Sequence, residues 1–295
     1  MKPIESVCCI ILNYNSSKEV IELYNQLNEF NNGVSIIIVD NNSEQEEKEL
    51  LLKSIDSNFL IFNKFNIGYA GGNNIGIKKA IKEDAKYVWI LNPDIQITKN
   101  TLPILLKTIE SNINIAAIGP RICYRNMPSK IYSDGGIILQ EKGFFTTHKN
   151  YNKESSSVHS LTKENEVDYV NGSAMLISVD AYRKIGFLKE GFFLYFEETE
   201  WCLRALKFKY KLVVNTEAIA YHISSKKGEL YHFYMTRNRI WLAKSQNKYV
   251  FITLKEVTKT VVLQLLRELK KGKISQNTKS RIKGLIAGVF GNVKK

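Results

Sequence analysis

The chain has 295 residues, of which 44% are hydrophobic and 24% charged, a composition typical of a globular protein with a sizeable core. The first apolar run, Val7 to Leu12, is too short to cross a bilayer and follows no signal-peptide pattern, so we expect a cytoplasmic protein. The four cysteines show neither a CxxC pair nor zinc spacing, which argues against a disulfide framework and a structural zinc. The net charge of +13 favours an anionic partner: nucleic acid, acidic lipid headgroups or phosphorylated substrates.

Residues 7–119 alternate short β-branched runs with amphipathic stretches, the pattern of a parallel sheet covered by helices. The predicted strands are Val7–Asn13, Ser35–Asp40, Phe59–Asn63, Tyr87–Leu91 and Ile115–Gly119. The predicted helices are one capped by Ser17, one over Glu44–Ile55 and one from about Gly72 to Asp84. We therefore expect an α/β fold.

The pattern is less regular in the second half of the chain. Irregular strands and an exposed loop are expected from Cys123 to Glu166, and order returns at Val167–Val179. The elements predicted next are a helix over Glu197–Phe208, the strand Lys211–Val214 and a segment ending at His222. After Lys226 the chain is helical and basic, which predicts a main domain over residues 1–225 and a helical extension over residues 226–295.

A carboxylate follows the second predicted strand. Asp40 comes directly after the apolar run Ile36–Val39. In open α/β sheets, ligands bind at the carboxyl ends of the strands, where an aspartate can accept hydrogen bonds from a base or a ribose hydroxyl. Asp-Asn-Asn-Ser is also good turn chemistry, so from this pattern alone a capping role for Asp40 stays open.

A glycine-rich segment, Asn66–Gly76, links the third predicted strand to its helix. Glycines let the backbone approach a ligand closely, and the start of a helix offers unpaired N–H groups to an anion. The segment has neither the G-x-G-x-x-G spacing of dinucleotide-binding proteins nor the Gly-Lys-Ser/Thr ending of a P-loop. Close packing of the helix on the sheet is the alternative explanation of these glycines.

A second carboxylate follows the fourth predicted strand, in the turn Asn92-Pro93-Asp94. Pro93 fixes its own φ and restricts Asn92, which makes the turn rigid. A hard cation such as Mg²⁺ or Mn²⁺ needs few protein oxygens when diphosphate and water complete its shell. Because Asp40 and the glycine segment are predicted at the same edge of the sheet, we interpret Asp94 as a ligand-binding residue rather than as part of a plain β-turn.

Glu197, Glu198 and Glu200 lie at the start of a predicted helix. The helix dipole favours acidic residues there, and Glu200 has the spacing of an ion pair with Arg204. These explanations cover Glu197 and Glu198 less well, because both lie among aromatic residues that could raise a carboxyl pKa toward that of a general base. We therefore expect a catalytic carboxylate at one of these two positions.

His222 follows a further strand-like run. A single histidine is more often structural than a ligand, and both roles stay open here. A neutral imidazole at this position would complete a metal shell begun by Asp94.

Eight stretches of the chain, taken in order, resemble the family 2 inverting glycosyltransferases with the GT-A fold, especially their bacterial rhamnosyltransferase-like branch. They are Val7 to Asn15, Ile36 to Ser43, Asn66 to Gly76, Trp89 to Ile95, Val170 to Ser178, Phe192 to Arg204, Ala220 to Ser225 and Tyr234 to Asn238. Each stretch is weak alone, but the ordered set is specific and extends to about residue 240. The resemblance implies a mixed, mostly parallel sheet flanked by helices, here followed by the basic helical extension.

The resemblance also implies roles for individual residues. The residues expected to bind the donor are Asn13, Tyr14, Asp40, Asn66, Gly68, Gly71, Asn73, Asn92 and Asp94. Asp94 stands at the last carboxylate of the family's Asp-x-Asp motif and would hold a divalent cation, Mg²⁺ or Mn²⁺, together with His222. Gly172 and Trp201 would border the acceptor, and Glu198 stands where the family has its general base.

The chain departs from the family pattern at two positions. Asn92 replaces the first aspartate of the metal motif, so metal affinity is expected to be modest. Glu198 replaces the usual aspartate and lengthens the base by one methylene, which leaves Glu197 as the alternative base.

The function implied by the resemblance is inverting transfer of a sugar from dTDP-L-rhamnose or a UDP-hexose to a saccharide acceptor, in the synthesis of O-antigen, capsule or another bacterial surface polysaccharide. Such an acceptor would be linked to polyprenyl diphosphate or be another saccharide. The basic C-terminal helices would then dock on anionic lipid of the inner leaflet, making the protein peripheral to the plasma membrane. Packing of these helices on the catalytic domain or on another subunit is the alternative, and a homodimer is left open.

Two other classes of protein fit part of the pattern. A sugar-phosphate nucleotidyltransferase would carry a glycine-rich, basic loop after the first strand, where this chain has Asn13-Tyr14-Asn15-Ser16-Ser17. An RNA-binding protein would fit the charge, but no RRM or KH motif is present and the acidic cluster argues against one, so we expect no nucleic-acid partner.

Overall fold

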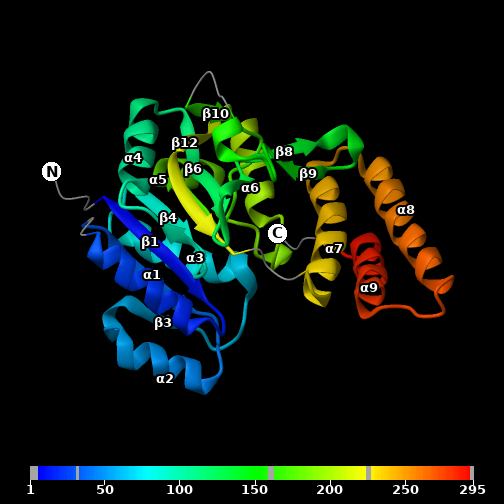
Figure 1. Cartoon of the computed structure of the whole chain (residues 1–295), viewed down its shortest axis with the longest axis horizontal. Helices are drawn as coiled ribbons and strands as arrows, with labels where there is room; N and C mark the ends of the chain where they lie inside the picture. Colours follow the sequence, from blue (N-terminus) through cyan, green and yellow to red (C-terminus); the bar gives the residue numbers. More distant parts are fainter. Residues whose placement is uncertain (1–5, 31–32, 159–162, 224–226, 293–295) are drawn as a thin grey trace.

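The computed structural model describes residues 6–30, 33–158, 163–223 and 227–292. Figure 1 shows a sheet between helices, with three C-terminal helices beside it. The strands are β1 (Val7–Asn13), β2 (Ser35–Asp40), β3 (Leu60–Phe62), β4 (Tyr87–Leu91), β5 (Gln96–Ile97), β6 (Ile115–Tyr124), β7 (Met127–Ser133), β8 (Gly136–Leu139), β9 (Phe145–His148), β10 (Glu164–Glu166), β11 (Ala174–Ser178) and β12 (Lys211–His222). The helices are α1 (Ser17–Glu29), α2 (Gln45–Ser54), α3 (Gly68–Lys82), α4 (Thr101–Ser111), α5 (Val179–Ile185), α6 (Glu197–Lys207), α7 (Glu229–Gln246), α8 (Val250–Leu269) and α9 (Gln276–Phe290).

The central sheet has the strand order β10-β12-β6-β11-β4-β1-β2-β3, and β5 and β7 pair with β12 and β6. The strands β3, β2, β1 and β4 are parallel to one another, and β6 is parallel to β12. The strand β11 lies between β4 and β6 and is antiparallel to both, so β6 and β12 run in the direction of β4. The predicted mixed, mostly parallel sheet is confirmed.

Alternation along the strands gives the sheet two apolar faces. One face, which includes Cys8 and Ile10 of β1, packs with α3, α5 and α6. The other face, which includes Cys9 and Ile11, packs with α1, α2 and α4. This sandwich leaves the ends of the strands free to form a site.

Two strands are longer than their sequence pattern predicts. The strand β6 continues past the predicted end at Gly119, and β12 runs unbroken to His222. Between Asn215 and Ile219 the register of β12 shifts opposite Pro120. Such an irregularity accommodates a proline, which has no N–H to donate to the neighbouring strand.

The segment predicted to be irregular contains β7 and a separate two-stranded hairpin, β8–β9. This hairpin reaches toward the C-terminal helices (Figure 1), and α8 packs on the short helix Gln140–Lys142 at its tip. The predicted basic helical extension is present as α7, α8 and α9. The predicted boundary between residues 225 and 226 lies outside the described residues. None of the helices in the described ranges is both long and apolar enough to cross a bilayer.

Candidate active site

Polar residues gather where parallel strands end. Asn13 and Asp40 are the last residues of β1 and β2, Asn92 directly follows β4, and His222 ends β12. Because these four strands run in one direction, their carboxyl ends share one edge of the sheet. The sheet thus brings together residues that are up to 209 positions apart in sequence, the separation of His222 from Asn13.

The Asn92-Pro93-Asp94 turn lies against His222. The short strand β5 follows the turn and pairs with Ala220 and Tyr221 of β12. This pairing brings Oδ2 of Asp94 to 3.2 Å from Nε2 of His222. The predicted pair of metal ligands therefore meets in space.

The donor atoms of this pair suit a divalent cation that keeps much of its shell for diphosphate and water. The buried Oδ1 of Asn92 has no hydrogen-bond partner among the described residues, so an oxygen is available beside the pair. Across the described ranges no cluster of three or more His, Cys, Asp or Glu side chains forms a complete metal cage. A cation bound here would therefore take its remaining ligands from the diphosphate and from water.

Asn13 and Asp40 form the core of a second polar cluster. Asp40 is fully buried and accepts hydrogen bonds from Nδ2 of Asn13 at 2.8 Å and from the backbone N–H of Ser43 at 3.0 Å. These bonds favour the capping role of Asp40 that the sequence left open. Tyr14, the next residue after Asn13, is 50% exposed beside this cluster and offers a ring to a ligand.

Asn41 joins this cluster to the glycine segment. Its Nδ2 donates to Oδ1 of Asn66 at 2.8 Å and to the carbonyl of Gly68 at 3.1 Å, while its Oδ1 accepts from the N–H of Ile67 at 3.2 Å. Asn41 was not among the predicted site residues, although its place after Asp40 in the same turn was a signal for it. The turn after β2 thereby sets the position of the start of α3.

The helix α3 begins at Gly68, four residues before the predicted start. Gly68 has a φ of +79°, and a Cβ there would lie 2.4 Å from the carbonyl oxygen of Phe193. The next residue, Tyr69, donates its N–H to the same oxygen at 2.5 Å. Only glycine allows this close approach between α3 and the loop before α6.

The glycines further along α3 serve packing. A Cβ on Gly72 would lie 2.3 Å from the side chain of Leu12, and one on Gly76 would lie 2.6 Å from that of Ile10. Gly71 and Asn73, two of the predicted donor-binding residues, are also buried within the helix. The packing explanation, which the sequence left open, therefore accounts for most of the segment.

The loop before α6 has an unusual backbone. Phe193, Tyr195 and Phe196 all have φ values between 66° and 74°, a region that residues with side chains rarely occupy. The conformation is held from α7, where Nδ2 of Asn238 donates to the carbonyls of Phe192, Leu194 and Tyr195 at 2.7–2.9 Å. The loop delivers Glu197 and Glu198 at the first turn of α6.

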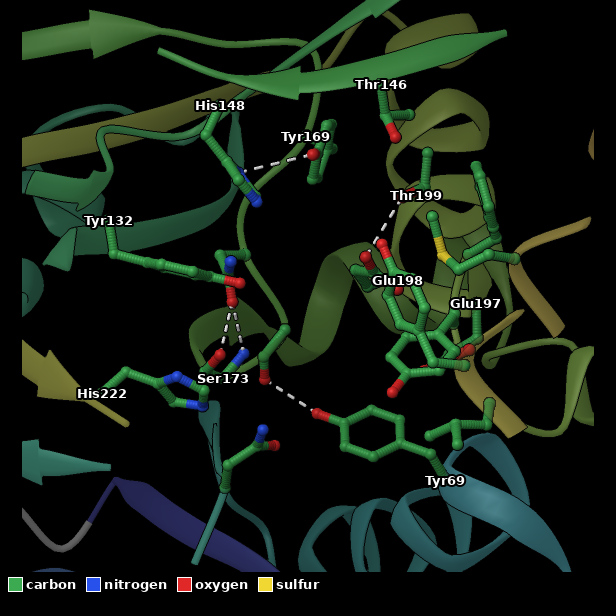
Figure 2. A pocket seen from close by; sticks show the side chains of 18 residues that line it. Tyr69, Tyr132, Thr146, His148, Tyr169, Ser173, Glu197, Glu198, Thr199 and His222 are labelled. Carbon is green, nitrogen blue, oxygen red and sulfur yellow. Dashed lines mark hydrogen bonds between the residues drawn. The ribbon is translucent and has the colours of Figure 1, made fainter. Parts of the chain in front are cut away.

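A cavity of about 310 Å³ lies in front of these two carboxylates. Figure 2 shows Glu197, Glu198 and Thr199 on one side of it and Tyr132, His148 and His222 on the other. The lining residues are Tyr69, Asn92, Tyr132, Thr146, His148, Tyr169, Asn171, Gly172, Ser173, Leu194, Tyr195, Phe196, Glu197, Glu198, Thr199, His222, Tyr231 and Met235. The cavity thus joins the metal-ligand turn to the acidic pair.

The two carboxylates differ in environment. Burial raises the pKa of Glu197 well above its usual value, and the charge of Glu198 raises it further. Burial also raises the pKa of Glu198, whose Oε1 accepts a hydrogen bond from the Thr199 hydroxyl at 3.1 Å. Glu197 is 3% exposed, whereas Glu198 is half-buried and faces the cavity. By contrast, Glu200 forms ion pairs with Arg204 and Lys189, both at 2.9 Å, and the pair with Arg204 is the one that their spacing predicts.

Gly172 lies beside Glu198, whereas Trp201 lies away from the cavity. A Cβ on Gly172 would be 3.5 Å from Cγ of Glu198, and its carbonyl accepts a hydrogen bond from the Tyr69 hydroxyl at 2.8 Å. Trp201 is fully buried and donates its indole N–H to the carbonyl of Gly186 at 2.8 Å. The prediction that Trp201 borders the acceptor is therefore wrong, because the face of α6 that carries it packs into the core.

An aromatic wall completes the cavity and was not predicted. Tyr132 stacks on His222 with 5.6 Å between ring centroids and contacts His148 at 5.2 Å. Burial lowers the pKa of His148 to about 4 and raises that of Tyr132 to about 12, so both rings are neutral near pH 7. These residues come from β7 and β9, in the segment whose sequence has no clear periodicity.

Comparison with known proteins identifies the family of this chain. Residues 8–186 match the family described as Glycosyl transferase family 2. The low-salt glycan biosynthesis hexosyltransferase Agl10 of Haloferax volcanii is 34% identical over 206 residues, which are 68% of this chain and 62% of that protein. The chain thus spans less than two thirds of that relative. The dTDP-rhamnosyl transferase RfbF of Shigella flexneri is 23% identical, with 97% of this chain and 96% of that protein aligned.

Two solved structures share the fold. One is GalNAc-T7 with UDP, GalNAc and Mn²⁺, with a TM-score of 0.62, 13% identity, and 96% of this chain and 55% of that chain covered. The other is the mannosyltransferase PcManGT from Pyrobaculum calidifontis in complex with GDP-Man and Mn²⁺, with a TM-score of 0.61, 10% identity, and 97% and 87% covered. The predicted GT-A fold is confirmed by these neighbours. Because the family match covers more than half of the sequence, the chain belongs to glycosyl transferase family 2.

Proposed function

We propose that this protein transfers a sugar from a nucleotide-diphosphate donor to a saccharide acceptor with inversion at the anomeric carbon. The observation that carries the proposal is a single cavity lined by Asn92 and His222 at one end and by Glu197 and Glu198 at the other. A donor held at the metal-ligand turn would present its anomeric carbon to an acceptor hydroxyl held near the carboxylates.

The reaction is a single displacement. Glu198 takes the proton of the acceptor hydroxyl, the acceptor oxygen forms the new bond to the anomeric carbon, and the bond to the diphosphate oxygen breaks. The nucleoside diphosphate leaves with the electron pair. Proton removal by a positioned base contributes about 10²–10⁴ in rate.

Asp94 and His222 are the residues that would hold a divalent cation, Mg²⁺ or Mn²⁺, with Asn92 beside them. When bound, such a cation neutralises charge that develops on the leaving diphosphate. The two solved neighbours were determined with Mn²⁺, which supports this choice of cofactor for this chain.

The dTDP-rhamnosyl transferase RfbF, aligned over nearly the whole chain, favours a dTDP-rhamnose donor. The resemblance of the ordered motifs favours a surface polysaccharide as product. A UDP-hexose is the second candidate, supported by the hexosyltransferase Agl10. The test is a screen of nucleotide-sugars for release of nucleoside diphosphate, with Mn²⁺, with Mg²⁺ and with a chelator. We expect cation-dependent turnover of one donor, and absence of turnover with every donor would contradict the proposal.

We also propose that α8 docks on the anionic inner face of the plasma membrane. Its outward side carries apolar residues that are 40–88% exposed, namely Phe251, Ile252, Val262, Leu263, Leu266 and Leu269. Exposed cations lie among and beside them, at Lys255, Lys259, Arg267, Lys270 and Lys271. Apolar residues interleaved with cations suit an anionic bilayer surface better than another protein or plain solvent.

Co-sedimentation with vesicles tests this docking. The double variant V262S/L266S should bind anionic vesicles about tenfold more weakly than the wild type, because less apolar surface enters the bilayer. Ile113→Ser, at a loop residue that is 89% exposed, is the matched control and should bind normally. Equal binding by all three proteins would exclude α8 as the docking surface.

A further inference from the structure

A second cavity, of about 610 Å³, lies between the β8–β9 hairpin and the three C-terminal helices. We call it the basic groove. Its lining residues are Lys142, Phe145, Thr146, Phe196, Lys227, Tyr231, Met235, Thr236, Arg239, Glu256, Val257, Thr260, Val261 and Arg281. Cationic and apolar side chains therefore line the same groove.

The groove carries unbalanced positive charge. Its four cations, Lys142, Lys227, Arg239 and Arg281, face one carboxylate, that of Glu256. In the described part of the chain, no acidic side chain lies within 4.0 Å of any of the four cations, whereas ion pairs form at other sites. Arg281 and Lys227 also lower the pKa of nearby His232, after the larger effect of burial. The groove is therefore suited to an anion.

One of these cations is already held in place. The Nε of Arg239 donates to the carbonyl of Gly143 at 2.6 Å, and its Nη2 donates to that of Lys142 at 2.8 Å. Burial lowers the pKa of this guanidinium, which shows that the charge is partly withdrawn from water. A fixed, partly desolvated guanidinium loses little freedom on binding an anion.

The basic groove adjoins the cavity at the acidic pair. Thr146, Phe196, Tyr231 and Met235 line both. A ligand that presents a hydroxyl to Glu198 can therefore extend past Tyr231 into the groove. On the α8 side, the apolar Val257 and Val261 lie beside Glu256 and Thr260 in the lining.

We propose that the basic groove binds the diphosphate of an acceptor whose saccharide lies near Glu198 and whose apolar chain leaves toward α8. The inference rests on the proposed function for the direction of the acceptor, but it assigns a separate binding site. Each phosphate oxygen held by a lysine or arginine gains a charge-assisted hydrogen bond. The apolar part of the lining, formed by Phe145, Met235, Val257 and Val261, favours an acceptor in which the diphosphate is joined to a hydrocarbon.

Direct binding tests the groove without turnover. The probes are farnesyl diphosphate, farnesol and inorganic diphosphate, titrated calorimetrically with a chelator present so that no metal-held diphosphate competes. We expect farnesyl diphosphate to bind at least about tenfold more tightly than either of the other two, because only it engages both the cations and the apolar lining.

The double variant K142Q/R281Q should weaken farnesyl diphosphate binding by about tenfold or more. Lys283→Gln, which makes the same kind of charge change at an exposed position of α9 outside the groove, is the control and should bind as the wild type does. Equal affinity for farnesol would show that the cations contribute nothing, and equal affinity for inorganic diphosphate would show that the hydrocarbon contributes nothing. Either result overturns the proposal, as does unchanged binding by K142Q/R281Q.

Failure of the groove proposal can be distinguished from failure of the proposed sugar transfer. Donor turnover without acceptor reports on the cavity at Asp94 and His222, and K142Q/R281Q should leave it within about twofold of wild type because neither residue lies there. If the wild type turns over donor normally but does not bind farnesyl diphosphate, that result contradicts only the role proposed for the basic groove.

Discussion

The side-chain amide of Asn238 on α7 donates a hydrogen bond to the backbone carbonyl of Tyr195 at 2.7 Å. Asn238 is fully buried, and the same nitrogen also reaches the carbonyls of Phe192 and Leu194. The C-terminal extension is thereby joined to the loop that positions Glu197 and Glu198. Tyr231 and Met235 of the same helix line the cavity, so α7 is part of the candidate active site.

Replacing Asn238 by alanine should lower both stability and activity. It leaves buried carbonyl oxygens unpaired beside a loop with positive φ values, so we expect a loss of about 2–4 kcal/mol in the free energy of unfolding. The kcat should fall at least about tenfold with little change in the KM for donor, because the residue positions the carboxylates without touching the donor. Gln246→Ala, on the same helix, should change neither quantity. A loss of stability with unchanged kcat would show that the bond is only structural.

Glu198→Gln should reduce sugar transfer by about 10²–10⁴ while the donor Kd stays within about twofold of wild type. Both carboxylates line the cavity, but Glu198 is half-buried beside Gly172, whereas Glu197 is almost completely buried. Glu197→Gln should therefore cost much less. Isothermal titration with donor and a transfer assay separate the two effects, and the opposite ranking of the two variants would assign the base to Glu197.

The acidic pair should make stability depend on pH. The raised pKa of Glu197 means that the folded state holds a proton that the unfolded state loses above the usual glutamate pKa of 4.5. The free energy of unfolding should therefore fall as pH rises from 4.5 through the folded-state pKa. Glu197→Gln removes the contribution of Glu197 to this dependence, so the variant should gain stability relative to wild type between about pH 5 and about pH 8. Urea unfolding of both proteins at the two pH values measures this difference in stability. An equal change in the free energy of unfolding in both proteins would contradict a buried Glu197 that stays protonated in the folded state.

Asp94→Asn and His222→Gln should each weaken cation binding in the presence of nucleoside diphosphate by about tenfold or more, because each removes one of a small number of protein ligands. Mn²⁺ binding followed by electron paramagnetic resonance gives a readout that does not depend on turnover. Asp180→Asn, at a carboxylate whose side chain is 76% exposed, is the control for the change in charge. Unchanged Mn²⁺ affinity in both site variants would remove the metal role from this turn.

The polar residues at the strand ends were predictable because strand direction follows from local patterns. Runs such as Ile36–Val39 predict buried parallel strands, and parallel strands end at a shared edge. Asp94 and His222 could therefore be predicted to meet from their positions after such runs. The roles of individual residues came from the ordered motifs, since one Asp or one His carries little information alone.

The amino-acid sequence by itself determined the α/β alternation, the strand-end edge, the acidic pair and the basic C-terminal helices, because each depends on spacing within a few residues. Only the tertiary structure decided that Trp201 lies in the core, that Gly72 and Gly76 serve packing, and that Tyr132 and His148 line the cavity. Those outcomes depend on which face of a helix meets the sheet and on contacts between segments far apart in the chain. The basic groove belongs to this second group, because its cations come from the β8–β9 hairpin, from α7 and the residues just before it, and from α9, and they converge only after the chain has folded.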